Sequence, residues 1–246
     1  VATSIPLAKS QQLVGKDIVL DRGAAVSGTV TFASQPLENV DVSMFVDCCD
    51  DRPFQTAQTD AEGHYSFQKL LPGKYYLKFD APEQPTLVTE YLGHSATRLR
   101  SAGVALGAGQ IRADADFEMK TGATISGSVT LAADGSPATG TWVSAYSITG
   151  RYAGKGGIVD EAGQYTITGI GPGTFFIKAD PTTTRLNAVP QWADAKSSPL
   201  TANAVTLDYE QENTTNFSLT AGSTIAGTVS ISGSGDPLSE KLVTVW

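Results

Sequence analysis

The chain has 246 residues, of which 41% are hydrophobic and 17% charged, and its net charge is −8 at pH 7. This composition can build a packed core. The acidic balance argues against a nucleic-acid partner, because phosphate binding needs clustered Lys and Arg. No run approaches the ~18 apolar residues of a membrane helix, so we expect no membrane insertion within this segment. The 25 Gly and 12 Pro are scattered, which predicts many turns between short elements.

The sequence repeats itself. Residues 23–31 read GAAVSGTVT, and the pattern returns as GATISGSVT at 122–130 and GSTIAGTVS at 222–230. A second block, TDAEGHYSF at 59–67, returns as VDEAGQYTI at 159–167. A period of about 100 residues suits a whole small domain rather than a solenoid unit.

The repeat divides the chain into four parts. We expect an N-terminal segment or remnant of a preceding unit at 1–20, a first β-sandwich repeat at 21–120 and a second at 121–220. The start of a third, incomplete repeat follows at 221–246. A domain that stops after its opening strands would leave sheet edges unpaired, which indicates a piece of a longer polypeptide.

Alternating side chains predict strands. Val26 and Val30 share one face of the opening segment, while Ser27 and Thr29 share the other, which is the period of a half-buried strand. Turn sequences such as 60–63 (DAEG) and 72–73 (PG) separate such segments, and no helical period is evident. The expected fold is all-β: tandem Greek-key β-sandwich domains, transthyretin-like or Ig-like, of about seven strands each.

The connectors between repeats are short. The closing segment that ends at Met119 is followed three positions later by Gly122, and Leu219 is followed in the same way by Gly222. A flexible tether would instead be a long Gly/Ser run. These connectors predict a stiff rod of domains.

Three motifs carry a resemblance to known families. They are Gly-x-x-Ile/Val-x-Gly-x-Val at the start of each repeat, Asp-x-x-Gly-x-Tyr in its centre, and Pro-Gly-x-Tyr/Phe after that. With these motifs the chain resembles the carboxypeptidase regulatory-like and Cna-B-like families, which are transthyretin-like (prealbumin-like) sandwiches of bacterial surface and secreted proteins. The resemblance implies an extracellular or cell-surface location and roles as stalks, spacers, adhesin modules or accessory domains of enzymes.

Cna-B-like domains often carry a Lys–Asn isopeptide crosslink promoted by a buried acidic residue. The opening segments 24–32 and 123–131 contain no Lys, and Phe79 and Ala179 stand where that family tends to place Glu. Asn216 lies near a closing strand without an evident partner. We therefore expect no crosslink.

Cys48 and Cys49 are adjacent and are the two cysteines of the chain. They can form a vicinal disulfide in an oxidising compartment, pair with other chains, or stay reduced at a strand end. A redox enzyme would normally separate them as Cys-x-x-Cys. The second repeat has no Cys at this place, so the pair is a local feature and not part of the framework.

No motif indicates catalysis, a cofactor or a metal. His64 and His94 have no marked Ser and Asp partners for a triad, and Cys48–Cys49 with a distant His lacks zinc-ligand spacing. The turns at Asp60 and Asp160 carry too few acidic residues for a calcium loop and are interpreted as hairpin turns.

Outward aromatic side chains are the remaining candidates. If Val42 and Met44 point inward, Phe45 points outward, and its counterparts are Tyr146 and Trp246. Exposed rings can stack on sugars, so Trp142, Tyr146 and Trp192 form a hypothetical carbohydrate-binding set. The favoured interpretation is that a ring recurring at one repeat position packs under a loop or against the next domain.

These observations predict a non-catalytic spacer or stalk segment of a larger bacterial extracellular or cell-surface protein. Its partners are the flanking domains of the same polypeptide. The alternative is an accessory or adhesin module that binds a polysaccharide or a host or surface protein through its outward aromatics.

Overall fold

The computed structural model describes residues 22–46, 52–150, 152–224 and 226–235, together with residue 237 and residues 6, 8–12, 14 and 15. Cys48, Cys49 and Trp246 lie outside the described residues, as do residues 16–21, so the predictions for them remain predictions. The chain divides into two compact units, Val1–Lys120 and Thr121–Trp246. We call the strands described in each unit, with the loops between them, the first and second domains.

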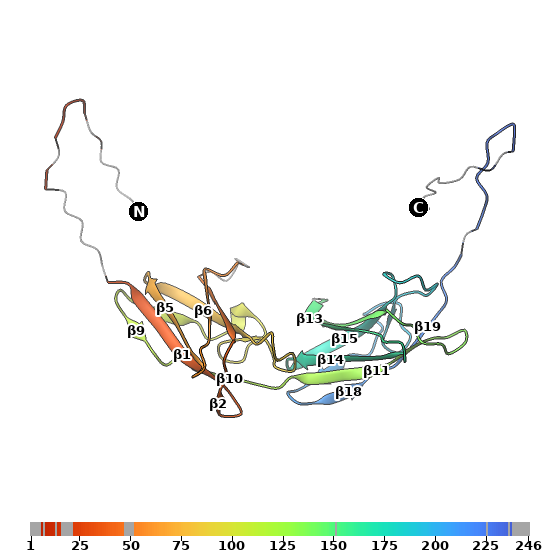
Figure 1. Ribbon diagram of the computed structural model, residues 1–246, viewed down its shortest axis with the longest axis horizontal. Coiled ribbons are helices and arrows are strands. Elements are labelled where there is room, and N and C mark those ends of the chain that lie inside the picture. The colour runs from red at the N-terminus through yellow and green to blue at the C-terminus, as the bar shows by residue number, and fades with distance from the viewer. Residues whose placement is uncertain are drawn as a thin grey trace. The chain divides into compact units, whose positions relative to one another are not determined.

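The first domain is built from strands (Figure 1). Their order is β1 (Ala24–Phe32), β2 (Gln35–Pro36), β3 (Asp41–Phe45), β4 (Gln55–Gln58), β5 (His64–Leu70), β6 (Gly73–Asp80), β7 (Glu90–Tyr91), β8 (Val104–Leu106), β9 (Ile111–Arg112) and β10 (Phe117–Met119), with a 3-10 turn, η1 (Arg98–Arg100), before β8. Among the described residues, seven of these strands have three or more residues, and β2, β7 and β9 have two each.

Two sheets enclose the core of the first domain. In one sheet, β1 pairs antiparallel with β2 and β5 and parallel with β9 and β10. The other sheet has the order β4-β3-β6-β7, and β8 also pairs with β6. Fully buried side chains from both sheets, such as Val26, Leu77 and Phe79, meet between them. The predicted alternation of β1 is confirmed, because its residues are buried and half-buried in turn.

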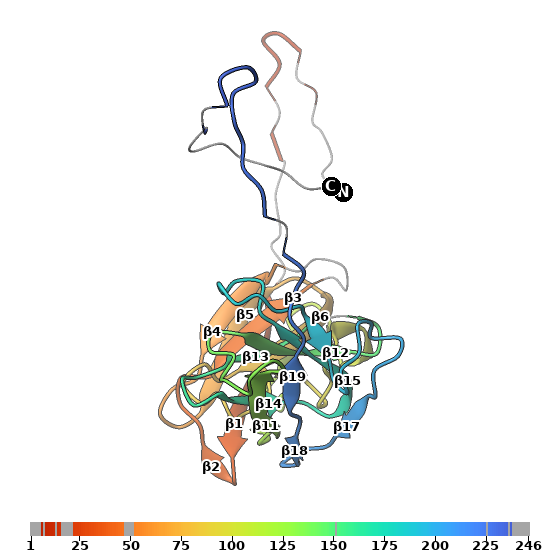
Figure 2. The ribbon, with the colours of Figure 1, turned by 90° about the vertical axis from the view of Figure 1, so that its right-hand side faces the viewer.

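The second domain repeats this arrangement. Its strands are β11 (Ala123–Leu131), β12 (Trp142–Ser147), β13 (Tyr152–Ile158), β14 (Gln164–Ile170), β15 (Gly173–Asp180), β16 (Gln191–Trp192), β17 (Val205–Leu207), β18 (Glu212–Thr214) and β19 (Phe217–Leu219). β11 pairs antiparallel with β14 and parallel with β18 and β19 (Figure 2). The second sheet has the order β13-β12-β15-β16, and β17 also pairs with β15. The all-β sandwich fold predicted from the sequence is confirmed.

The closing segment of each domain crosses its opening strand at a glycine. A Cβ atom on Gly28 would collide with the carbonyl oxygen of Ala115, and a Cβ on Gly127 would collide with that of Thr215. The second glycine of the repeated opening motif is therefore required by close backbone approach, not by a turn.

Two further hydrogen bonds hold this crossing in the first domain. The Tyr65 hydroxyl donates to the Ala115 carbonyl at 2.5 Å, and the Thr29 N–H donates to Asp116 Oδ1 at 2.8 Å. Burial raises the pKa of the Tyr65 hydroxyl, with a further contribution from the charge of Asp116, so the hydroxyl remains a donor at neutral pH. We call the glycine, the tyrosine and the Asp116 side chain, with the backbone they contact, the strand clasp.

The second domain has the same clasp. Tyr165 donates to the Thr215 carbonyl at 2.6 Å, and the Ser128 N–H donates to Asn216 Oδ1 at 2.8 Å. The clasp thus explains why the glycine of the opening motif and the tyrosine of the central motif recur together, although about 40 residues separate them.

No helix within the described part of the chain is long and apolar enough to cross a membrane.

The clasp predicts a stability effect at Gly28. Gly28→Ala forces the closing segment away from β1 and should lower the free energy of unfolding of the first domain by about 1–3 kcal/mol. The measurement is urea unfolding of the full chain. Gly107→Ala is the matched control, because its added Cβ would meet only the Gln110 side chain at 3.5 Å. Equal stability of the two variants would contradict the clasp.

Candidate functional site

The aromatic candidates lie on the outer face of the sheet β13-β12-β15-β16. Val143 and Ala145 are fully buried in the core of the second domain. Because side chains alternate along a strand, Trp142, Ser144 and Tyr146 point to the opposite face. We call this surface the outer face of the second domain.

Strand register arranges the outer face in three rows. The cross-strand neighbours are Ile158, Trp142 and Asp180 in the first row, Gly156, Ser144, Lys178 and Trp192 in the second, and Tyr152, Tyr146 and Phe176 in the third. In the middle row, Gly156 and Ser144 are small. They separate Trp142 in the first row from Tyr146 and Tyr152 in the third.

Tyr146 and Trp192 come together as the sequence hypothesis requires. Their ring centroids are 5.3 Å apart in an edge-to-face arrangement. The ring centroids of Phe176 and Trp192 are 6.5 Å apart, and those of Tyr152 and Tyr146 are 5.9 Å apart. Tyr146, Trp192 and Phe176 are each half-buried, so this aromatic cluster has a structural role in covering the sheet.

Trp142 occupies a separate place. Its indole lies where a side chain at position 156 would project, and Gly156 makes room for it. The residue remains 36% exposed. The structure therefore divides the predicted set into a packed pair, Tyr146 and Trp192, and one open ring, Trp142.

Polar groups stand on β15, the strand next to Trp142, and the Lys178 ammonium lies over the Trp192 ring, 6.0 Å from the ring centroid. Lys178 Nζ and Asp180 Oδ2 form an ion pair at 2.6 Å, and Thr182 Oγ1 donates to Asp180 Oδ1 at 2.6 Å. Partial burial raises the pKa of Asp180, but the hydrogen bonds from Lys178 and Thr182 outweigh it and hold the pKa below its usual value. Asp180 is therefore ionised near neutral pH.

Ser144 lies under the outer-face side chains. It is 1% exposed, and its Oγ has no hydrogen-bond partner among the described residues. A buried hydroxyl without a partner is uncommon, because desolvation costs it free energy that a hydrogen bond would return.

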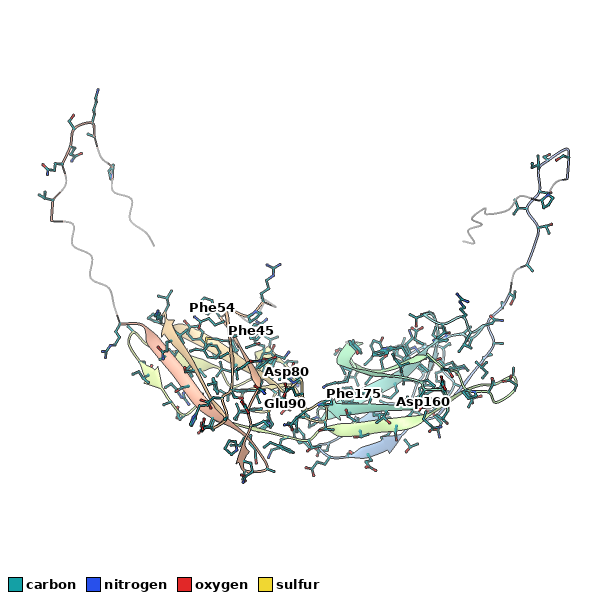
Figure 3. The ribbon with its side chains drawn as sticks, in the orientation of Figure 1. Phe45, Phe54, Asp80, Glu90, Asp160 and Phe175 are labelled. Carbon is teal, nitrogen blue, oxygen red and sulfur yellow. The ribbon has the colours of Figure 1, made fainter. Side chains whose placement is uncertain are left out.

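The corresponding face of the first domain is closed. Phe45, labelled in Figure 3, stands at the position of Tyr146. The Arg98 guanidinium lies over this ring, 4.7 Å from the ring centroid. Phe45 is only 6% exposed. In this domain the ring packs under a loop, as the favoured interpretation has it. In the second domain the uncharged Pro199 stands at the position of Arg98.

The histidines make local contacts. His64 is exposed, and its Nδ1 is 3.8 Å from Asp60 Oδ1. His94 Nδ1 is 2.9 Å from Glu90 Oε2, and the Glu90 carboxylate is buried. Sequence reasoning missed Glu90. The signal that could have found it is Gln191, a second polar residue at the same buried place of the next repeat.

Metal-binding groups are not evident in the described residues. Asp60 Oδ1 accepts hydrogen bonds from the N–H groups of Glu62 and His64, and Asp160 does the same in the second domain. These contacts are those of a polar turn. No group of three or more His, Cys, Asp or Glu within the described ranges could hold a metal ion.

Asn216 has a partner that the sequence did not reveal. Its Oδ1 accepts from the N–H of Ser128 at 2.8 Å and lies 3.2 Å from the Ser128 hydroxyl. The sequence offered no Lys partner for a crosslink at Asn216, and the crossing of the closing segment brings its side chain onto β11 as a hydrogen-bond acceptor. Asp116 has the same role in the first domain.

Both domains are thus β-sandwiches whose opening and closing strands pair in parallel. Residues 24–133 match the family model of the SdrD B-like domain. The first domain is therefore a Cna-B-like, prealbumin-like β-sandwich, as the resemblance of its motifs predicted. The family is one of structural domains of cell-surface proteins rather than enzymes.

Solved structures share less with the chain. The minor pilin GBS52 of Streptococcus agalactiae is 12% identical, with 84% of this chain and 100% of that one covered at a TM-score of 0.40. The shaft pilin SpaA of Lactobacillus rhamnosus GG is 9% identical. The match covers 84% of this chain and 100% of that one, at a TM-score of 0.32.

The Bacillus anthracis TIE protein is 13% identical, with 82% of this chain and 34% of that one covered at a TM-score of 0.31, so the chain spans about a third of that protein. The family assignment of the first domain rests on the match of residues 24–133 to the family model. No curated protein matches the chain.

The two tryptophans should differ in their effect on stability. Trp192→Ala removes a half-buried ring from the aromatic cluster and should lower the free energy of unfolding of the second domain by roughly 1–3 kcal/mol. Trp142→Ala removes a more exposed ring and should cost less. Urea unfolding and near-UV circular dichroism measure both effects. A larger loss for Trp142→Ala would contradict the division into a packed pair and an open ring.

Asp180 should make the second domain sensitive to acid. Because its folded-state pKa is depressed, its contribution to stability is present above the unfolded-state pKa of about 3.9 and is lost as the pH falls through the folded value. The Asp180→Asn chain should therefore lose less stability than the wild type on acidification below about pH 4. Urea unfolding across this pH range tests it, with Glu161→Gln as an exposed control in the same domain. If the free energies of unfolding of wild type and Asp180→Asn fell in parallel with pH, the contribution of ionised Asp180 to stability would be refuted.

Proposed function

We propose that the chain is a non-catalytic stalk or spacer segment of a larger bacterial cell-surface protein, with the flanking domains of the same polypeptide as its partners. The match to a family of surface-protein structural domains supports this role. The short connectors between repeats support it too, since they leave little slack between successive domains.

The observation that carries the proposal is the parallel pairing of the first and last strands in each domain. Residues 30–32 of β1 pair with 117–119 of β10, and residues 129–131 of β11 pair with 217–219 of β19. In parallel neighbours, the start of one strand and the end of the other lie at opposite ends of their shared ladder. Tension that enters at the start of β1 and leaves at the end of β10 therefore acts along the strands.

Such loading is favourable for a stalk. The evenly spaced hydrogen bonds of a parallel ladder are then sheared together instead of being opened one after another. The clasp adds the Asp116 side chain to the same junction, because it binds the backbone N–H of Thr29 across the two segments. Asn216 and Ser128 repeat this bond in the second domain.

Single-molecule pulling of the full chain from its two ends tests the stalk. We expect two distinct unfolding events, one for each domain. Asp116→Ala removes one clasp bond and should lower the unfolding force of one event while leaving the other unchanged. Glu62→Ala, an exposed turn residue of the first domain, is the control. Extension without discrete events, or equal forces for Asp116→Ala and Glu62→Ala, would refute load transfer through the clasp.

A second candidate function is an adhesin or accessory module that binds a polysaccharide or a surface protein. The observation that favours it is the exposed Trp142 on the outer face of the second domain, beside the Lys178–Asp180 ion pair. A spacer and a binding surface are compatible within one chain, because the clasp and the outer face belong to opposite sheets of the sandwich.

A further inference from the structure

We propose that the outer face of the second domain binds a neutral polysaccharide and seats one sugar ring on Trp142. This inference deepens the second candidate function and does not depend on the stalk. Its site consists of Trp142, the Lys178–Asp180 ion pair and the neighbouring Ile158.

The support under Trp142 comes from Gly156. The indole occupies the space of the missing side chain at 156, so it lies against β13 instead of projecting freely into solvent. A ring held in this way loses less conformational freedom when a ligand stacks on it. The 36% exposure of the residue leaves surface for that contact.

The chemistry beside the ring suits a sugar. A pyranose presents C–H groups on its face and hydroxyl groups around its rim. The aromatic surface of Trp142 can contact the face, while Asp180 accepts hydrogen bonds and Lys178 donates them. Asp180 is the cross-strand neighbour of Trp142 on β15, and Lys178 stands one row further along the same strand.

Charge favours a neutral ligand. The Lys178 ammonium is paired with the Asp180 carboxylate at 2.6 Å, so the pair offers no net positive charge to an anion. The chain as a whole carries a charge of −8 and would repel an acidic polymer.

Comparison of the two domains shows that the fold does not require this site. At the positions of Trp142, Gly156 and Ile158, the first domain has Asp41, Thr56 and Gln58. There Gln58 donates a hydrogen bond to Asp41 at 2.9 Å, and the row is polar. The same sandwich therefore forms with or without an open ring on this face, so core packing does not account for Trp142.

Affinity electrophoresis of the full chain tests the proposal. The probes are hydroxyethylcellulose, galactomannan and soluble mixed-linkage β-glucan as neutral polymers, and polygalacturonate as an anionic one. We expect at least one neutral polymer to retard the chain and Trp142→Ala to weaken that binding at least tenfold, about 1.4 kcal/mol. Asp180→Ala should weaken it as well.

The matched control is Phe54→Ala, which removes a 51% exposed ring from the first domain and should leave retardation unchanged. Near-UV circular dichroism of each variant confirms that the domains are folded. Retardation that persists in Trp142→Ala would overturn the proposal, as would retardation by polygalacturonate alone or by none of the four polymers.

Sedimentation of the wild type and Trp142→Ala separates a sugar from a protein occupant. Wild-type self-association that Trp142→Ala abolishes, without retardation by a neutral polymer, would assign the face to a second copy of the chain and overturn the proposal. These outcomes leave the pulling experiment unaffected, so failure of the sugar site is distinguishable from failure of the stalk.

Discussion

The crossing of the closing segment over the opening strand is the constraint on which each domain depends. Gly28 and Gly127 allow two backbones to approach where any side chain would collide. The tyrosine hydroxyl then satisfies the carbonyl group brought into the core, which would otherwise lose its hydration without compensation. Without this crossing, β10 and β19 could not pair in parallel with the opening strands, and the sheet would lose the strand that closes it.

Because of the crossing, the two sheets of each domain differ in which strands they contain. The sheet that contains β1 also contains β10, so the first and last strands of the domain lie in one sheet, which is suited to carry load. The opposite sheet connects only strands within the domain, and its outer face is free to vary. The two repeats differ most clearly there: the first has a polar row and a ring covered by Arg98, whereas the second has an aromatic cluster and the open Trp142.

Much of the architecture could be predicted from particular residues. The alternation of Val26 and Val30 with Ser27 and Thr29 predicted β1, because a strand places successive side chains on opposite faces. The same parity placed Trp142 and Tyr146 on the outer face. It could not predict that Phe45, the counterpart of Tyr146, would be covered, because Arg98 reaches its ring from a loop about 50 residues further along the chain.

The sequence by itself determined the repeat, the strand pattern, the turns and the family, since each depends on residues close together in the chain or on recurrence at a fixed spacing. Only the tertiary structure decided what the recurring residues do. Gly28 and Tyr65 act on one carbonyl group, that of Ala115, which lies some 50 residues beyond the tyrosine. Asn216 accepts a hydrogen bond from Ser128, which lies 88 residues earlier in the chain. Such contacts follow from how the strands cross, which no local pattern contains.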